Sequence, residues 1–146
     1  MGNRRKGFTL AELIVGVVVM IVTLGVATMS LRSTDQTARR EAERLTAYIN
    51  RQKDKAERIH KDFNMTVDPY KVLINWGDRQ YDDASFEASD GCGYSKNFPN
   101  GDVNYLANQQ RFAQGGTIIV QDANGAKCDI TVAATEGRIT ISSQYY

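Results

Sequence analysis

A single carboxylate stands at the head of a long apolar run near the N-terminus. The basic residues Arg4, Arg5 and Lys6 precede Gly7, and Glu12 is the only charged residue from Phe8 to Leu31. Insertion of a carboxylate costs roughly 2.5–3.5 kcal/mol at a bilayer centre and less near its edge. Either a positive charge compensates Glu12, or its side chain reaches the lipid headgroups. The chemistry that this residue predicts is ion pairing.

Two cysteines and one histidine are the other reactive side chains. Cys92 and Cys128 both fall in the part predicted to lie outside the cytoplasm, where two thiols in one small domain usually pair. A bridge closing a loop of about 37 residues would stabilise the fold by roughly 4 kcal/mol. His60 is too far from both cysteines in sequence for a zinc motif. We therefore predict a Cys92–Cys128 disulfide and no metal site.

The remaining polar and aromatic clusters have ordinary structural explanations. No spacing among the acids of the central region matches a calcium loop, so we expect solvated surface acids. The aromatic residues are expected to pack rather than to form an adhesive patch, and the basic run to be the wet face of a helix. The residues concerned are Asp82, Asp83, Asp90 and Asp102; Trp76, Tyr81, Tyr94 and Tyr105; and Arg39, Arg40, Arg44, Arg51, Lys53 and Lys55.

Neither an enzyme nor a nucleic-acid binder is indicated. The sequence has no Gly-rich phosphate loop, Ser-His-Asp arrangement or metal-ligand spacing, so we expect no catalysis and no cofactor. Residues 32–62 carry nine Lys and Arg against six Asp and Glu, a net charge of +3. Residues 63–146 carry six against ten, a net charge of −4. A nucleic-acid binder would more often show a clear basic excess, so nucleic acid is an unlikely partner.

The apolar run must be positioned by a membrane or by partner helices. Residues 13–31 contain no charge. The length of this segment is close to the roughly 20 residues that a spanning helix needs. The preceding basic cluster predicts a cytoplasmic N-terminus and an external C-terminal part. Two ordinary explanations are a secretory signal cut after a small residue such as Ala27 and a plain single-pass anchor.

The helix is expected to continue as an amphipathic one. Apolar residues recur at three- and four-residue steps, or at their sum, and form one stripe opposite a charged face. They are Ala38, Ala42, Leu45, Ile49, Ala56, Ile59 and Phe63. Because no proline interrupts residues 9–64, we expect one helix of about 54 residues, on the order of 80 Å long. Its second half requires a sheet against its apolar side.

That sheet is predicted downstream as an antiparallel one. Hairpin signals such as Asn124-Gly125 separate β-branched runs near the C-terminus. The expected strands are residues 71–76, 116–121, 128–133 and 138–142, with short strands near 85–88 and 103–106 inside the polar stretch 77–114. The fold class is therefore α+β, with a long N-terminal helix on a C-terminal antiparallel sheet.

The stretch "KGFTLAEL" suggests why Glu12 stands at the head of the apolar run. It resembles the prepilin leader of type IV pilins and type II secretion pseudopilins: a short basic leader ending in Gly7, then Phe8, then Glu12 as the fifth residue after the cut. The resemblance implies cleavage between Gly7 and Phe8 by a prepilin peptidase, followed by N-methylation of Phe8. It also implies that Glu12 pairs with the Phe8 amine of a neighbouring subunit in a helical filament.

The soluble part is similar to H-type minor pseudopilins and related minor pilins. The similarity rests on "EAERLTAYINRQKDKAERIHKDFNMTVD" and "DANGAKCDITVAATEGRITIS". It implies a leader at residues 1–7, a transmembrane filament-core helix at 8–31 and a periplasmic pilin-like domain at 32–146. The expected location is the inner membrane, as a single-pass protein assembled into a filament.

The expected function follows from this similarity. The chain would be a minor pseudopilin of a type II secretion pseudopilus, with other pseudopilin subunits, the inner-membrane assembly platform and membrane lipid as partners. The first alternative is a minor pilin of a type IV pilus that acts in assembly priming, adhesion or motility. The second is a DNA-binding minor pilin of a competence system, against which the negative balance of residues 63–146 argues.

Overall fold

The protein has an α+β fold with antiparallel sheets. The structure, a computed structural model, describes residues 10–77 and 80–142, and inside its first helix it gives no side chains for residues 11, 12 and 23–36. The chain divides into two compact units whose boundary falls between Ser33 and Thr34. The α-helix α1 (Leu10–Ile59) contributes residues to both units.

The helix α1 ends earlier than its apolar pattern predicts. We expected helix through Asn64, but α1 stops at Ile59 because His60 adopts a left-handed backbone with φ of 53°. The amide of Lys61 then donates to the carbonyl of Ala56 at 3.1 Å, which is the closing bond of a Schellman motif. The prediction was therefore wrong for the last residues, and Phe63 begins a strand instead.

The first sheet has five strands in the order β3-β2-β1-β5-β6, all antiparallel. The predicted strands at residues 71–76, 85–88 and 103–106 are confirmed to within a residue or two. Two strands were not predicted: β1, whose first residues were expected to be helical, and the very short β6. The strands are β1 (Phe63–Asp68), β2 (Lys71–Asn75), β3 (Ala84–Glu87), β5 (Val103–Leu106) and β6 (Arg111–Phe112).

The second sheet has four antiparallel strands in the order β4-β7-β8-β9. The predicted C-terminal meander is confirmed as three consecutive strands, β7 (Gly116–Asp122), β8 (Lys127–Val132) and β9 (Ile139–Ser142). The strand β4 (Cys92–Asn97) was not predicted. It lies at the edge beside β7, and its Tyr94 amide donates to the Pro69 carbonyl at 2.7 Å. This bond connects the two sheets.

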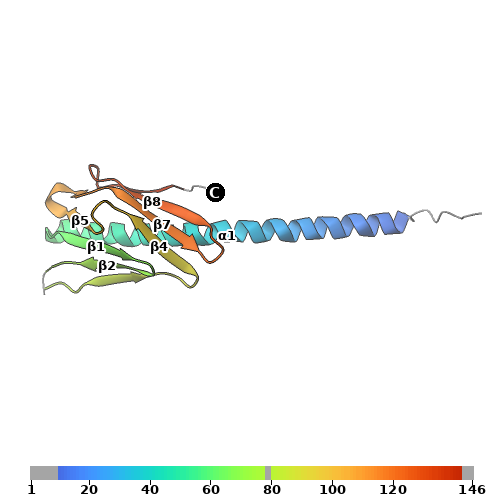
Figure 1. The fold of residues 1–146 in the computed structure, drawn as a ribbon, viewed down its shortest axis with the longest axis horizontal. Coiled ribbons are helices and arrows are strands. Elements are labelled where there is room, and N and C mark those ends of the chain that lie inside the picture. Colours follow the sequence, from blue (N-terminus) through green and yellow to red (C-terminus); the bar gives the residue numbers. More distant parts are fainter. Residues whose placement is uncertain (1–9, 78–79, 143–146) are drawn as a thin grey trace, which may run out of the picture. The chain divides into compact units, whose positions relative to one another are not determined.

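The core of the unit from Thr34 onward lies between α1 and both sheets. Figure 1 shows α1 running along the strands of the two sheets. The helix contributes Ala38, Ala42, Leu45, Ile49 and Ala56, all at most 1% exposed, so the predicted apolar stripe is confirmed up to Ala56. Alternate residues of the strands face it, and together they exclude water from its apolar surface. These include Met65, Val72, Ile74, Val103, Tyr105, Phe112, Ile118, Val120, Ile130 and Val132.

Candidate functional site

The predicted processing and assembly residues fall largely outside the described part of the chain. Gly7 and Phe8 precede the first described residue, and Glu12 belongs to α1 without a described side chain. Cleavage, methylation and the Glu12 pairing therefore stay predictions. The predicted spanning segment, residues 8–31, is described only in part. Within the described residues, no helix has a stretch long and apolar enough to cross a membrane.

The first unit presents apolar side chains all around α1. The described large side chains from Leu13 to Val22 are each between 49% and 66% exposed. Because these residues are nearly consecutive, they point in every direction around the helix axis. A helix that is apolar all round requires lipid or partner helices to cover it.

The second unit contains a carboxylate buried on the apolar stripe of α1. Glu41 is 2% exposed, and its Oε1 accepts hydrogen bonds from the Tyr94 hydroxyl at 2.6 Å and from the Ser89 amide at 3.1 Å. Its Oε2 accepts from the Ser89 hydroxyl and from the Arg44 guanidinium, each at 2.7 Å. Three of these four bonds tie the helix to β4 and to the loop between β3 and β4, and the bond from Arg44 lies within α1. We call Glu41, Arg44, Ser89 and Tyr94 the Glu41 cluster.

The bonds of the Glu41 cluster determine its protonation. Burial alone would raise the pKa of Glu41, but the hydrogen bonds from Tyr94 and Ser89 and the charge of Arg44 outweigh burial and lower that pKa below its ordinary value. Burial, followed by the hydrogen bond to Glu41, raises the pKa of Tyr94 far above its ordinary value. At neutral pH the cluster therefore holds an ionised carboxylate and a protonated phenol.

The loop between β3 and β4 is shaped so that Ser89 reaches Glu41. Gly91 has a φ of 78°, which L residues with side chains rarely adopt, and the Cys92 amide donates to the Ser89 carbonyl at 2.9 Å. The Ala88 amide donates to the Tyr70 carbonyl at 2.8 Å. The loop is thus held on one side by the turn between β1 and β2 and on the other by α1.

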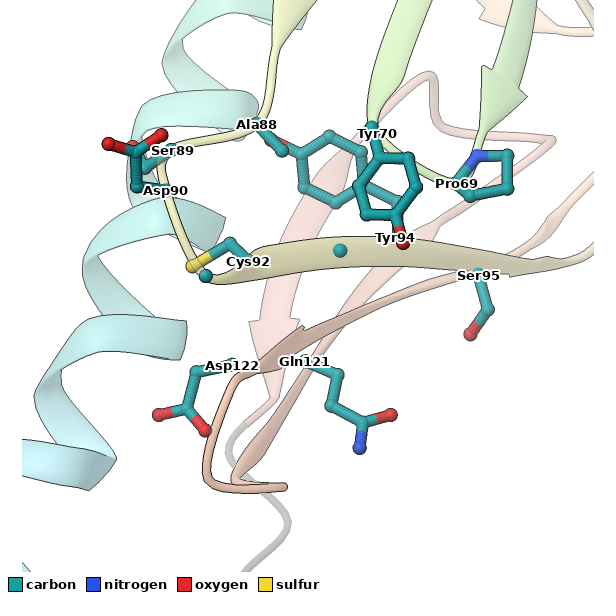
Figure 2. A pocket seen from close by; sticks show the side chains of 12 residues that line it. Pro69, Tyr70, Ala88, Ser89, Asp90, Cys92, Tyr94, Ser95, Gln121 and Asp122 are labelled. Carbon is teal, nitrogen blue, oxygen red and sulfur yellow. The ribbon is translucent and has the colours of Figure 1, made fainter.

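A hollow of about 550 Å³ opens beside the Glu41 cluster. Figure 2 shows Pro69 and Tyr70 on one side of β4, Gln121 and Asp122 on the other, and Asp90 near the end closest to α1. Gly93, Ser95 and Gln121 alternate with buried residues, so they face away from the core. Tyr70 is 73% exposed. We call this cavity the Tyr70 hollow.

The predicted disulfide is not formed. Cys92 and Cys128 are free, buried thiols. Cys92 on β4 pairs with Asp122 of β7, whereas Cys128 on β8 pairs with Val120 of β7. A whole strand therefore separates them, which places their backbones about 10 Å apart, beyond the reach of a disulfide. Burial raises the pKa of both thiols, so they are packing residues in this fold.

The polar groups of the central region behave as surface residues or local caps. Asp83 accepts bonds from the Trp76 amide and the Asn75 side chain, and Asp102 pairs with Lys96 at 3.3 Å. Asp82 and Asp90 are exposed. Within residues 10–77 and 80–142, no group of three potential ligands could hold a metal ion.

The aromatic and basic residues named from the sequence differ in their exposure to solvent. Trp76, Tyr94 and Tyr105 are at most 5% exposed, and Tyr81 packs at the edge of the core, so they form no exposed patch. The Lys55 ammonium lies over the Trp76 ring, 4.6 Å from its centre. Lys53 donates to the Gly137 carbonyl. The arginines Arg39, Arg40, Arg44 and Arg51 are exposed, as expected for a solvated helix face.

Sequence reasoning missed Glu41, although a signal was present. Glu41 lies three residues after Ala38 and four before Leu45, so it belongs to the same helix face as the predicted apolar stripe. A carboxylate in that position requires bonding partners, because an unpaired buried charge is strongly unfavourable. Its partners Ser89 and Tyr94 are 48 and 53 residues away, and only the fold identifies them.

Comparison with known proteins identifies the N-terminal segment. Residues 2–28 match the prokaryotic N-terminal methylation motif. No curated protein and no solved structure matches the chain. The motif and the α+β fold are consistent with the type IV pilin-like class. More particularly, this chain carries the prepilin signal of that class, which implies processing by a prepilin peptidase and assembly with other pilin subunits as a membrane-anchored filament subunit.

Proposed function

We propose that this chain is a minor pseudopilin, a structural subunit of the pseudopilus of a type II secretion system. The observation that carries the proposal is the methylation motif over residues 2–28. Gly7, Phe8 and Glu12 lie within it and are the residues to which the resemblance assigns cleavage, methylation and filament assembly. The protein would act by assembly and not by catalysis. Its filament would move folded proteins across the outer membrane.

The exposed apolar residues of α1 are consistent with this role. Side chains from Leu13 to Val22 need a cover that the unit itself does not supply. In a filament, the same segments of neighbouring subunits would provide it. Before assembly, membrane lipid would do so.

The first test is the intact mass and N-terminal sequence of the chain extracted from membranes of cells that contain a prepilin peptidase. We expect a chain that begins at Phe8 and carries one added methyl group. A Gly7→Val variant provides the control, because it should keep the leader. An uncut wild-type chain, or one cut near Ala27, would refute a filament subunit.

A second test separates a secretion pseudopilus from a type IV pilus. Deletion of the gene should abolish secretion of folded proteins into the medium while leaving surface pili and motility intact. Loss of pili with normal secretion would instead identify a minor pilin.

A further inference from the structure

The exposed face of α1 carries a row of arginines. Arg40, Arg44, Arg51 and Arg58 are exposed, and steps of four, seven and seven residues keep them on one side of the helix. The row extends about 27 Å at 1.5 Å per residue. We call it the arginine stripe.

Arg51 and Arg58 do not pair with the carboxylates around the Tyr70 hollow of the same copy. Arg44 bonds to Glu41 and Ser89 at one end of the stripe. Arg51 is about 10 Å further along the axis, and it makes no hydrogen bond or ion pair with the other described residues. Arg58 donates to a carbonyl of its own helix, that of Asp54. Arg51 and Arg58 therefore offer guanidinium groups to a partner.

The Tyr70 hollow has the opposite character. Within the described residues from Thr34 onward, Tyr70 is the one large hydrophobic side chain that is mostly exposed to solvent. A second hollow of about 460 Å³ lies beside it and shares Pro69, Tyr70 and Ala88 with the first. The exposed carboxylates of Glu87 and Asp90 are on the rims of these hollows. Lys71 is the only basic residue in the two linings.

The chemistry of the two surfaces is complementary. Tyrosine and arginine are, with tryptophan, the residues enriched at interface hot spots, and a guanidinium both stacks on an aromatic ring and binds carboxylates bidentately. The same complementarity holds for larger parts of the chain, because residues 32–62 carry a net charge of +3 and residues 63–146 a net charge of −4. The negative charge of residues 63–146, which include Glu87 and Asp90, also disfavours anionic ligands in the hollow.

The two surfaces lie on different layers of the unit. The stripe points away from the helix face that packs on the sheets, and the hollow is on the side of β4 and β7 that points away from the core. Contact between the hollow of one copy and the stripe of another is therefore heterologous. A heterologous contact that does not close into a ring generates an open helical array.

We propose that the Tyr70 hollow of one copy receives the arginine stripe of a second copy of this chain, with Tyr70 stacking on Arg51 or Arg58 and with Glu87 and Asp90 pairing with their guanidinium groups. The proposal rests on the proposed role as a filament subunit, and it requires that at least two copies of this chain be neighbours in the filament. The contact would fix the lateral position of the globular unit, whereas the apolar part of α1 would supply most of the buried area.

The test is site-specific photo-crosslinking in the full chain, made in cells with a prepilin peptidase. A benzophenone amino acid replaces Tyr70, and we expect a covalent dimer whose cross-link maps to residues 40–58 of the second copy. The double variant Arg51→Glu, Arg58→Glu should lower the dimer yield about tenfold, equivalent to about 1.4 kcal/mol. Adding Glu87→Lys and Asp90→Lys to the same chain should restore it, because each copy then presents both reversed charges.

The matched control reverses an exposed charge elsewhere. Arg111→Glu on β6, at the other edge of the first sheet from β3, should leave the dimer yield unchanged. The N-terminal mass is measured on each sample. A chain that is cut at Gly7 but gives no dimer, or cross-links only to a different protein or to lipid, overturns this inference and leaves the proposed function standing. An equal loss of dimer in the Arg111→Glu variant also overturns it.

Discussion

At the scale of single residues, buried polar groups decide how the helix is attached to the sheets. Glu41 receives four hydrogen bonds from three residues on α1, β4 and the loop before β4. An ionised carboxylate that is 2% exposed is stable only with such donors. Near the C-terminal end of α1, the Tyr105 hydroxyl makes a similar bond to a helix carboxylate and donates to Glu57 at 2.5 Å.

Replacing Glu41 by glutamine should destabilise the second unit. Gln lacks the charge for Arg44 and has one acceptor oxygen instead of two, so we expect a loss of about 2–4 kcal/mol in the free energy of unfolding. Trp76 is the only tryptophan and is 4% exposed, so its fluorescence reports unfolding of the full chain in denaturant. The control is Glu43→Gln, which removes only an exposed pair with Arg39 and should change stability by less than about 0.5 kcal/mol.

The same variant predicts a pH dependence. Because the pKa of Glu41 is lowered by folding, the unfolded chain binds more protons, and the contribution of Glu41 is complete above its ordinary pKa of 4.5. It is lost as pH falls through the lowered value. The difference in stability between wild type and Glu41→Gln should therefore be constant from pH 7 to 6 and shrink below pH 4.5. An equal difference at pH 3 would contradict an ionised Glu41.

The two thiols give a chemical test of the strand order. Cys92 and Cys128 lie on strands separated by β7, so the native full chain should contain no disulfide and should react slowly with a thiol reagent. Mass spectrometry should show two alkylated thiols after denaturation without reductant. A native chain that gains two labels only after reduction would show that the thiols are paired.

At the scale of elements, glycines set where strands and loops approach one another. Gly137 has a φ of 58°, and a Cβ there would lie 2.1 Å from the carbonyl oxygen of Gln110. Because that obstacle is backbone, the turn before β9 must shift if any side chain is added. Gly101 has a similar φ of 81° but open space around it.

Comparison of these glycines should isolate the effect of close packing. Both Gly101→Ala and Gly137→Ala place alanine in the left-handed region, which costs about 1–2 kcal/mol. Only Gly137→Ala adds a steric clash, so its loss of stability should exceed that of Gly101→Ala by about 1–3 kcal/mol. Equal losses, measured by Trp76 fluorescence in denaturant, would contradict the close approach of Gly137 to Gln110.

At the scale of the whole molecule, assembly depends on the N-terminal segment. Glu12 is the only charge between Phe8 and Leu31, and the methylation motif spans it. If Glu12 pairs with the methylated Phe8 amine of a neighbour, its removal should act on assembly without affecting cleavage at Gly7.

We expect a Glu12→Gln variant to be cut and to stay in the membrane but to lose at least about tenfold in its incorporation into filaments, an effect of about 1.4 kcal/mol or more. Incorporation is measured by the amount of chain sheared from cells together with filaments. The control is Asp82→Asn, which removes an exposed carboxylate outside the motif. Normal incorporation of Glu12→Gln would show that Glu12 does no more than reach the headgroups.

The sequence alone determined the N-terminal methylation motif, the amphipathic stripe from Ala38 to Ala56 and most of the strands, because these depend on local spacing. Two local predictions failed for local reasons: His60 ends α1 in a left-handed conformation, and β4 has too few β-branched residues to be seen. Only the tertiary structure decided the partners of Glu41, the separation of Cys92 from Cys128 and the hollow beside Tyr70. Those features depend on which strands become neighbours, and the order β4-β7-β8-β9 is set by packing between residues far apart in the chain.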